Sequence, residues 1–304
     1  MRTDVTFPSS GLALAGILFT PDEPGPHPLP AIVVSHPGGG VKEQSPTTYG
    51  ERLARAGFAV LAFDAARQGA SEGEPRGEED PFQRAEDVRA AVSHLTTRPE
   101  IDPERIGALG ICASGGYVPY AAQTDRRIKA VATVSAADFG RVIREGVDGT
   151  QPPEVLDAVL ARAGELRTAE ARGEPPHREP WVPDEWRDSA HRQDRETWEF
   201  YRTARGAHPR AGGTRLPRDL DRIALYDSFA LIRLLAPRPL LMIAGSAADT
   251  AHLSREAVAA ATGPAELRTV DSATHVDLYD RDEHVTTAVA ELTRFFTAHL
   301  AAAG

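Results

Sequence analysis

The sequence lacks a pair of cysteines and any long apolar run. Its single cysteine, Cys112, cannot form an intrachain disulfide, which fits a reducing compartment. No window approaches the roughly 18 uninterrupted apolar residues of a membrane span. The N-terminal stretch MRTDVTFPSSGLALAGILF has an early acidic residue and an apolar segment broken by Gly and Ser, so it does not indicate a signal peptide. We therefore expect a cytoplasmic protein with no membrane partner.

An excess of basic residues is also missing. The 34 Lys and Arg residues are outnumbered by 44 Asp and Glu residues, and the net charge is -10 at pH 7. Nucleic-acid binding needs a basic face, so we expect no nucleic-acid partner. No His/Cys cluster has the spacing of metal ligands, so we expect no metal or organic cofactor.

What is present is an alternation of apolar strand patterns with helical patterns along 304 residues. This order is typical of an α/β fold with a mostly parallel central sheet and helices on both faces. The alternation stops over 138–226, which is rich in Pro, Arg, Glu and Trp and has no clean strand pattern. We predict a core domain formed by 1–137 and 227–304, with 138–226 inserted as a cap. A separate small domain is the alternative.

The segment GICASGG, residues 110–116, contains two candidate nucleophiles, Cys112 and Ser114. A nucleophile at the tip of a sharp strand-to-helix turn needs small residues two positions before and after it. Gly110 and Ser114 meet this need for Cys112, whereas Cys112 and Gly116 meet it for Ser114. Because the apolar strand pattern extends through Ile111, we predict Cys112 as the nucleophile. Ser114 remains the alternative.

A nucleophile of this kind needs a base and a residue that orients the base. His275 follows the last predicted strand and is the predicted base. Asp249, in the segment GSAADT after the preceding strand, is the predicted acid, and Asp277 is the weaker alternative. We expect His275 and the helix N-terminus to favour the thiolate of Cys112, so that iodoacetamide reacts faster than with an unperturbed thiol.

Two further groups of residues complete the predicted site. The backbone N–H groups of Gly38, in the loop HPGGG, and Ala113 are the predicted oxyanion hole, with Gly39 as the next choice after Gly38. Aromatic residues of the inserted segment are natural walls for an apolar pocket, and we choose Trp186 and Tyr201 as substrate-binding residues. The alternative is that these aromatic residues only attach the cap to the core.

Together these segments resemble the dienelactone-hydrolase-like branch of the α/β-hydrolase superfamily, which includes uncharacterised bacterial hydrolases and fungal polyketide transferases. The strings that carry the resemblance are HPGGGVKEQ, FDAARQGASEGEPR, GICASGGY, GSAADT and ATHVDLYD. That branch is known for Cys in place of Ser at the turn. The resemblance implies a triad of Cys112, His275 and Asp249 under a cap. Glu43 is the candidate for the extra carboxylate that activates the cysteine in dienelactone hydrolases.

From the residues and the resemblance we expect an enzyme that attacks an ester, thioester or lactone carbonyl of a small-molecule substrate. An acyl-enzyme would form on the thiol, and water or an acceptor alcohol or amine would then release the acyl group. The alternative is a protein that keeps the fold but uses the pocket for cyclisation, carbon–carbon cleavage or binding.

Overall fold

The computed structural model describes all residues except 24, 26–27, 187, 189–191 and 302–304. An 8-stranded sheet has the order β1-β2-β4-β3-β5-β6-β9-β10. Its strands are β1 (Arg2–Ser9), β2 (Leu12–Phe19), β3 (Leu29–Ser35), β4 (Ala59–Phe63), β5 (Ile101–Ile111), β6 (Ile128–Val134), β9 (Leu240–Gly245) and β10 (Ala265–Val270). β2 pairs antiparallel with β1 and β4, and every pair from β4 to β10 is parallel.

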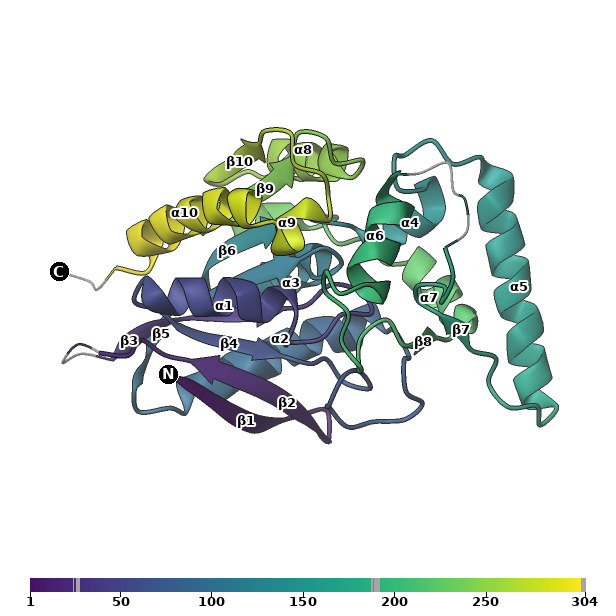
Figure 1. Cartoon of the computed structure of the whole chain (residues 1–304), viewed down its shortest axis with the longest axis horizontal. Helices are drawn as coiled ribbons and strands as arrows, with labels where there is room; N and C mark the ends of the chain where they lie inside the picture. Colours follow the sequence, from purple (N-terminus) through teal and green to yellow (C-terminus); the bar gives the residue numbers. More distant parts are fainter. Residues whose placement is uncertain (24, 26–27, 187, 189–191, 302–304) are drawn as a thin grey trace.

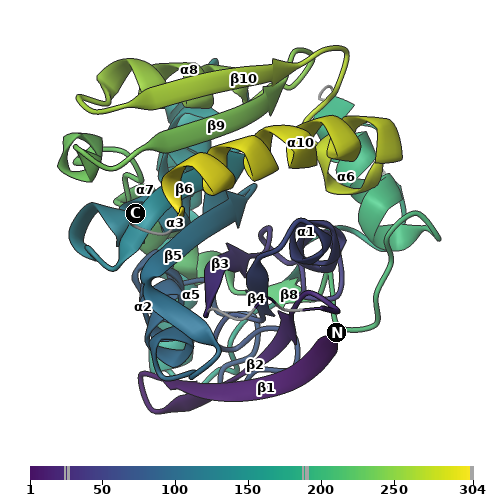
Figure 2. The ribbon, with the colours of Figure 1, turned by 90° about the vertical axis from the view of Figure 1, so that its left-hand side faces the viewer.

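Helices cover both faces of this sheet (Figure 2). α1 (Ser45–Arg55) and α10 (Asp282–His299) pack on one face, and α2 (Pro81–Thr96), α3 (Ser114–Thr124) and α8 (Ala251–Ala260) pack on the other. Because both faces are removed from water, the central strands are continuously apolar; all of β4 is buried. The predicted fold class, a mostly parallel sheet with helices on both faces, is confirmed.

We call residues 138–226, inserted between β6 and β9, the cap segment. Figure 1 shows its helices grouped beside the sheet, with α5 outermost. Its elements are α4 (Phe139–Glu145), α5 (Pro153–Ala171), β7 (Glu179–Pro180), α6 (Arg192–Arg202), β8 (Thr214–Arg215), η1 (Pro217–Asp219) and α7 (Leu220–Ala224). The chain then returns through η2 (Ile232–Leu235), which packs against α3 of the core. The two-residue ribbon strands explain why the sequence had no clean strand pattern here.

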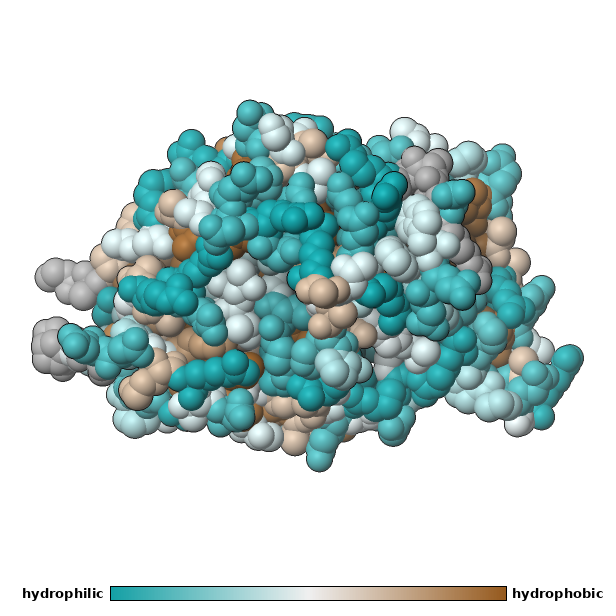
Figure 3. Space-filling view, viewed as in Figure 1, coloured by the Kyte–Doolittle hydropathy of each residue, from teal (hydrophilic) through white to brown (hydrophobic). Residues whose placement is uncertain are grey.

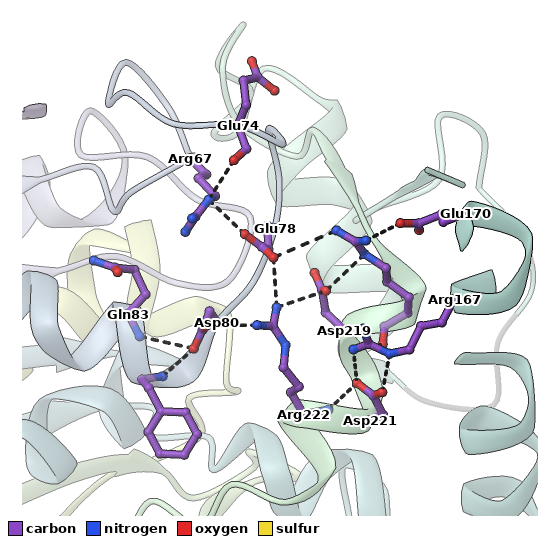
Figure 4. Close-up of polar contacts among 12 residues, drawn as sticks. Arg67, Glu74, Glu78, Asp80, Gln83, Arg167, Glu170, Asp219, Asp221 and Arg222 are labelled. Carbon is purple, nitrogen blue, oxygen red and sulfur yellow. Dashed lines mark hydrogen bonds and ion pairs between the residues drawn. The ribbon is translucent and has the colours of Figure 1, made fainter. Parts of the chain in front are cut away.

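Ion pairs join the cap segment to the loop after β4 (Figure 4). The Glu78 carboxylate lies 2.9 Å from Arg67 of the core and 3.0 Å from Arg222 of α7. Arg222 also contacts Asp80 and Asp219, each at 3.2 Å. Burial raises the pKa of Asp219 to about 6, although the Arg222 guanidinium opposes this shift. The network contributes little to the stability of the fold, because desolvation offsets much of the attraction between the charges.

The loops after β3, β5, β9 and β10 all leave the sheet at the carboxyl ends of parallel strands. Ligands bind at this edge in open α/β sheets. The loop after β3 carries HPGGG, and the turn after β5 carries Cys112. The loops after β9 and β10 carry Asp249 and His275, and the second leads into the short helix α9 (Asp277–Asp280). The fold therefore brings the four loops that carry the predicted site residues to one edge.

Candidate active site

Cys112 stands at the tip of the turn between β5 and α3. Its φ of 56° lies in the left-handed region, which non-glycine residues adopt at a cost of about 1–3 kcal/mol. A Cβ atom on Gly110 would lie 1.9 Å from the Ser114 carbonyl oxygen, so only glycine fits two positions before the cysteine. β5 ends at Ile111, as the sequence predicts. This is the backbone geometry that presents a nucleophile above a parallel sheet.

Ser114, the alternative, lies beneath this turn rather than at its tip. Its side chain is buried, and its hydroxyl donates to the His36 carbonyl oxygen at 2.6 Å. The Ser114 hydroxyl oxygen also accepts a hydrogen bond from the Arg84 guanidinium at 2.9 Å and lies 2.9 Å from the Ser35 hydroxyl. Three polar partners hold this hydroxyl between the HPGGG loop and α3. Cys112, by contrast, lines a pocket.

Two backbone N–H groups, those of Ala113 and Gly38, are directed at the Cys112 sulfur. The Phe139 ring packs closely against the Gly38 backbone, since a Cβ atom on Gly38 would lie 2.7 Å from this ring. The Tyr201 hydroxyl donates to the Gly38 carbonyl oxygen at 3.1 Å and holds the loop from the cap side. Convergent N–H groups next to a nucleophile are the arrangement that stabilises an oxyanion.

His275 is buried and reaches the sulfur through a tyrosine. Its Nε2 atom lies 3.0 Å from the Tyr279 hydroxyl, which is also within hydrogen-bonding reach of the Cys112 thiol. Its Nδ1 atom lies 2.6 Å from the Thr250 hydroxyl. The Ser135 hydroxyl donates to the His275 carbonyl oxygen at 2.8 Å and fixes the loop. Tyr279, His275 and Thr250 therefore form a hydrogen-bonded chain that ends beside Cys112.

The structure does not bring Asp249 to His275, in contrast to the prediction. In the described part of the chain the Asp249 carboxylate makes no hydrogen bond to this imidazole, and Thr250 occupies the place at Nδ1. The reason is the start of α8. Thr250 directly precedes the helix and its side chain is buried, whereas Asp249 is partly exposed. Asp277 is also directed elsewhere, toward the Thr274 N–H at 3.2 Å and the Arg205 guanidinium at 3.3 Å.

Glu43 does not reach the thiol. Its carboxylate lies 2.9 Å from the Lys42 ammonium and also contacts Arg210 of the cap segment. Lys42 in turn contacts the buried Asp64 carboxylate at 2.8 Å. Glu43 therefore belongs to a charge network beside the HPGGG loop. In the part of the chain that the structure describes, no group of three or more His, Cys, Asp or Glu residues could hold a metal ion.

The protonation states at the site differ from the thiolate expected from the sequence. Burial raises the pKa of the Cys112 thiol, although the Tyr279 hydroxyl and the N–H groups of Ala113 and Gly38 oppose this shift. Burial also lowers the pKa of His275 to about 4. Desolvation disfavours the charged form of both groups. These shifts favour a neutral thiol beside a neutral imidazole at pH 7, whereas the sequence analysis expects a thiolate.

We expect iodoacetamide to alkylate Cys112 more slowly than it alkylates free glutathione at pH 8, because the thiolate is the reacting form. The protein has one cysteine, so the mass added by the reagent reports on this residue alone. The measurement is the alkylation rate as a function of pH, with urea-unfolded protein as the matched control. Faster alkylation of the folded protein than of the unfolded chain would contradict the neutral thiol.

A cavity of about 220 Å³ opens above Cys112, between the core and the cap segment. Gly38 and Tyr279 lie beside the thiol, and the walls are mostly apolar side chains of the cap segment: Phe139, Val142, Ile143, Trp181, Val182, Tyr201, Leu220 and Ile223. Of the two aromatic residues chosen from the sequence, Tyr201 lines this cavity. Trp186 instead packs against Trp198, with 6.2 Å between ring centroids, and Trp181 takes the expected place in the wall.

The described residues contain no helix that is long and apolar enough to span a bilayer. The face of the molecule in Figure 3 is mostly hydrophilic, with small separate hydrophobic areas. The mostly apolar walls of the cavity above Cys112 are typical of small-molecule sites.

Comparison with known proteins extends these observations. The dienelactone hydrolase family matches residues 14–151. The uncharacterised protein YcjY of Escherichia coli (strain K12) is 37% identical, over 97% of this chain and 98% of its own length. The crystal structure of hypothetical protein PA2218 from Pseudomonas aeruginosa superimposes with a TM-score of 0.93 at 35% identity, covering 98% of this chain and 94% of that one.

A relative with a named activity is the polyketide transferase grgF of Penicillium sp, 30% identical over 60% of this chain and 58% of its own length. The crystal structure of the α/β hydrolase GrgF from Penicillium sp. sh18 shares the fold, with a TM-score of 0.84 at 23% identity over 99% of both chains. The fold, the sharp turn at Cys112 and the similar proteins all point to the same family. The chain belongs to the dienelactone hydrolase family and is an α/β hydrolase, an enzyme of the hydrolase or acyltransferase type.

Proposed function

We propose that this enzyme transfers the acyl group of a small-molecule ester, thioester or lactone through a covalent intermediate on Cys112. The observation that carries the proposal is the position of the sulfur. It lies on a strained turn at the floor of an apolar cavity, and the N–H groups of Gly38 and Ala113 converge on it. The name of the relative grgF, a polyketide transferase, supports acyl transfer as well as hydrolysis.

In the first half-reaction the Cys112 sulfur adds to the substrate carbonyl carbon, and the thiol proton passes to His275. The carbonyl oxygen becomes an oxyanion that accepts hydrogen bonds from Gly38 and Ala113. The intermediate collapses when the bond to the leaving group breaks and His275 returns a proton to that group. In the second half-reaction His275 takes a proton from water or from an acceptor alcohol or amine, which attacks the acyl-thioester and frees Cys112.

The test is to locate the acyl group. Wild type incubated with p-nitrophenyl butyrate and quenched in acid should carry one butyryl mass, and peptide mapping should place it on Cys112. The Ser114→Ala variant should still be acylated, since Ala also fits the turn, and Cys112→Ala should gain no mass. Butyryl mass on Ser114 with Cys112 free, or acylation of Cys112→Ala, would overturn the proposal.

We propose that Thr250 orients the imidazole in place of Asp249. With Nδ1–H donating to the Thr250 hydroxyl, Nε2 is left free to accept a proton. Thr250→Val removes this acceptor at nearly constant volume, and we expect turnover to fall about tenfold, the equivalent of one net hydrogen bond of about 1.4 kcal/mol. Asp249→Asn is the matched control and should stay within about twofold of wild type. The reverse order of the two effects would restore Asp249 as the orienting residue.

We propose that the cap segment selects the acyl group. Trp181 forms part of the cavity wall and packs against Phe139, with 5.9 Å between ring centroids. Trp181→Ala enlarges the cavity, so we expect activity to shift toward longer chains in a series of p-nitrophenyl esters from acetyl to decanoyl. Trp186→Ala, outside the cavity, is the control and should leave the order of chain lengths unchanged. Equal shifts in both variants, or none in Trp181→Ala, would contradict this role.

A further inference from the structure

Tyr279 occupies the position between the proposed nucleophile and its base. It lies on α9, four residues after His275, so the last strand's loop and one helical turn place both side chains on the same side. Its hydroxyl is 3.0 Å from His275 Nε2 and within hydrogen-bonding reach of the Cys112 thiol. Among the described residues, Tyr279 lines the same cavity as Cys112 and its hydroxyl lowers the pKa of the thiol, whereas His275 has no such effect on it.

We propose that Tyr279 is a further catalytic residue, whose hydroxyl carries the proton between Cys112 and His275. The inference rests on the proposed function, because it assigns a role within the acyl transfer at Cys112. In this relay the imidazole does not take the proton from the nucleophile directly. The relay also adds Tyr279, which the sequence analysis does not name, to the site.

The surroundings suit this role. The Tyr279 side chain is 3% exposed, and its ring packs edge to face on Phe200 at 5.2 Å and on His275 at 5.7 Å between centroids. This packing holds the ring in place and leaves the hydroxyl free to form hydrogen bonds. Burial raises the pKa of the phenol well above its ordinary value, so the hydroxyl stays neutral. A neutral hydroxyl has one proton to donate and lone pairs to accept another, which a relay requires.

In the resting site the thiol S–H donates to the Tyr279 oxygen, the Tyr279 O–H donates to Nε2, and Nδ1–H donates to Thr250. As the sulfur lone pair forms the C–S bond, the S–H proton moves to the Tyr279 oxygen and the Tyr279 proton moves to Nε2. The carbonyl π electrons go to the oxygen facing Gly38 and Ala113. Tyr279 ends as it began, with its O–H now directed at the sulfur.

The collapse of the tetrahedral intermediate, later in the same half-reaction, uses the same path. When the C–leaving-group bond breaks, the electron pair stays on the leaving group, and the imidazolium proton reaches it through the Tyr279 oxygen. Removing the hydroxyl should therefore slow acylation while leaving the apolar cavity intact.

The test is Tyr279→Phe, assayed by the burst of p-nitrophenolate from p-nitrophenyl butyrate, which measures acylation. We expect the acylation rate constant to fall about 10²-fold, the lower end for general acid–base catalysis. The matched control is Tyr49→Phe, which removes another buried hydroxyl next to α9, one that donates to the Leu278 carbonyl oxygen at 2.7 Å. This control should lower the Tm with little change in acylation.

A second readout separates the relay from a structural effect. In mixtures of H₂O and D₂O, two protons moving together give a curved dependence of the acylation rate on the deuterium fraction. We expect curvature in wild type and in Tyr49→Phe, and a straight line in Tyr279→Phe. If Tyr279→Phe does not fold, 3,5-difluorotyrosine at position 279 keeps the shape and lowers the phenol pKa. The relay then predicts a changed acylation rate and a changed curvature.

The outcomes distinguish the two claims. If Tyr279→Phe acylates as fast as wild type, or faster, with its curvature intact, the relay is overturned while acylation of Cys112 still supports the proposed function. If Cys112→Ala is acylated, the proposed function fails first and the relay with it. Loss of rate together with loss of curvature, in a variant with native circular dichroism, supports the relay.

Discussion

The His275→Ala variant is expected to lose about 10²–10⁴-fold in kcat/KM on p-nitrophenyl butyrate. In the proposed mechanism its imidazole is the base to which the Cys112 proton passes. Burial lowers the pKa of His275 to about 4, so the ring is neutral and able to accept that proton at pH 7. The measurement is steady-state turnover of variant and wild type at pH 7. Added imidazole should restore part of the activity by occupying the vacated space.

His284→Ala is the matched control for this loss. His284 lies at the start of α10, and its ring contacts the exposed Glu283 carboxylate at 3.4 Å. Its removal should leave turnover within about twofold of wild type, as for most substitutions away from a site. A folded His275→Ala variant with near-wild-type turnover would end the assignment of this residue as the base.

Gly38→Ala is expected to lower kcat by about 10²–10³-fold, comparable to the loss of one oxyanion-hole donor. The added Cβ atom would lie 2.7 Å from Phe139 Cζ, closer than real Cβ contacts allow, and the aromatic ring is packed on Trp181. Either the ring or the loop must move, and movement of the loop takes the Gly38 N–H away from the Cys112 sulfur. The measurement is kcat on p-nitrophenyl butyrate.

The double variant Gly38→Ala/Phe139→Ala tests this explanation. Truncation of Phe139 makes room for the new methyl group, so kcat should recover toward the value of Phe139→Ala alone. An additive loss would instead mean that the ring is not what displaces the loop, and undiminished kcat in Gly38→Ala would remove Gly38 from the predicted oxyanion hole.

The course of the chain at the turn could be predicted because it depends on local sequence. The apolar pattern ending at Ile111 and the crowding at Gly110 both act within a few residues of Cys112. The parallel sheet is equally local in origin, because buried strands such as β4 have an uninterrupted apolar sequence. These features need no knowledge of distant contacts.

The partners of His275 depend on contacts that no sequence pattern specifies. Asp249 and Thr250 are neighbours in the chain, and the start of α8 decides which one faces the imidazole. Trp181 and Trp186 belong to the same irregular stretch. Trp181 lines the cavity because it packs on Phe139, whereas Trp186 packs on Trp198. The raised pKa of the Cys112 thiol could not be predicted for the same reason, because the elements that bury the thiol lie far apart in the sequence. For Tyr279, the one feature of the sequence that could have indicated a place in the site is its position four residues after His275.

The neutral state of Cys112 has a consequence for the lifetime of the enzyme. Peroxides and other oxidants consume thiolates rather than thiols, and attack also requires access to the sulfur. In this protein the sulfur is only partly exposed, at the floor of a cavity under the cap segment, and burial keeps its proton in place. We therefore expect the resting enzyme to present little of the thiolate form that oxidants attack, and its only cysteine to be oxidised slowly between turnovers.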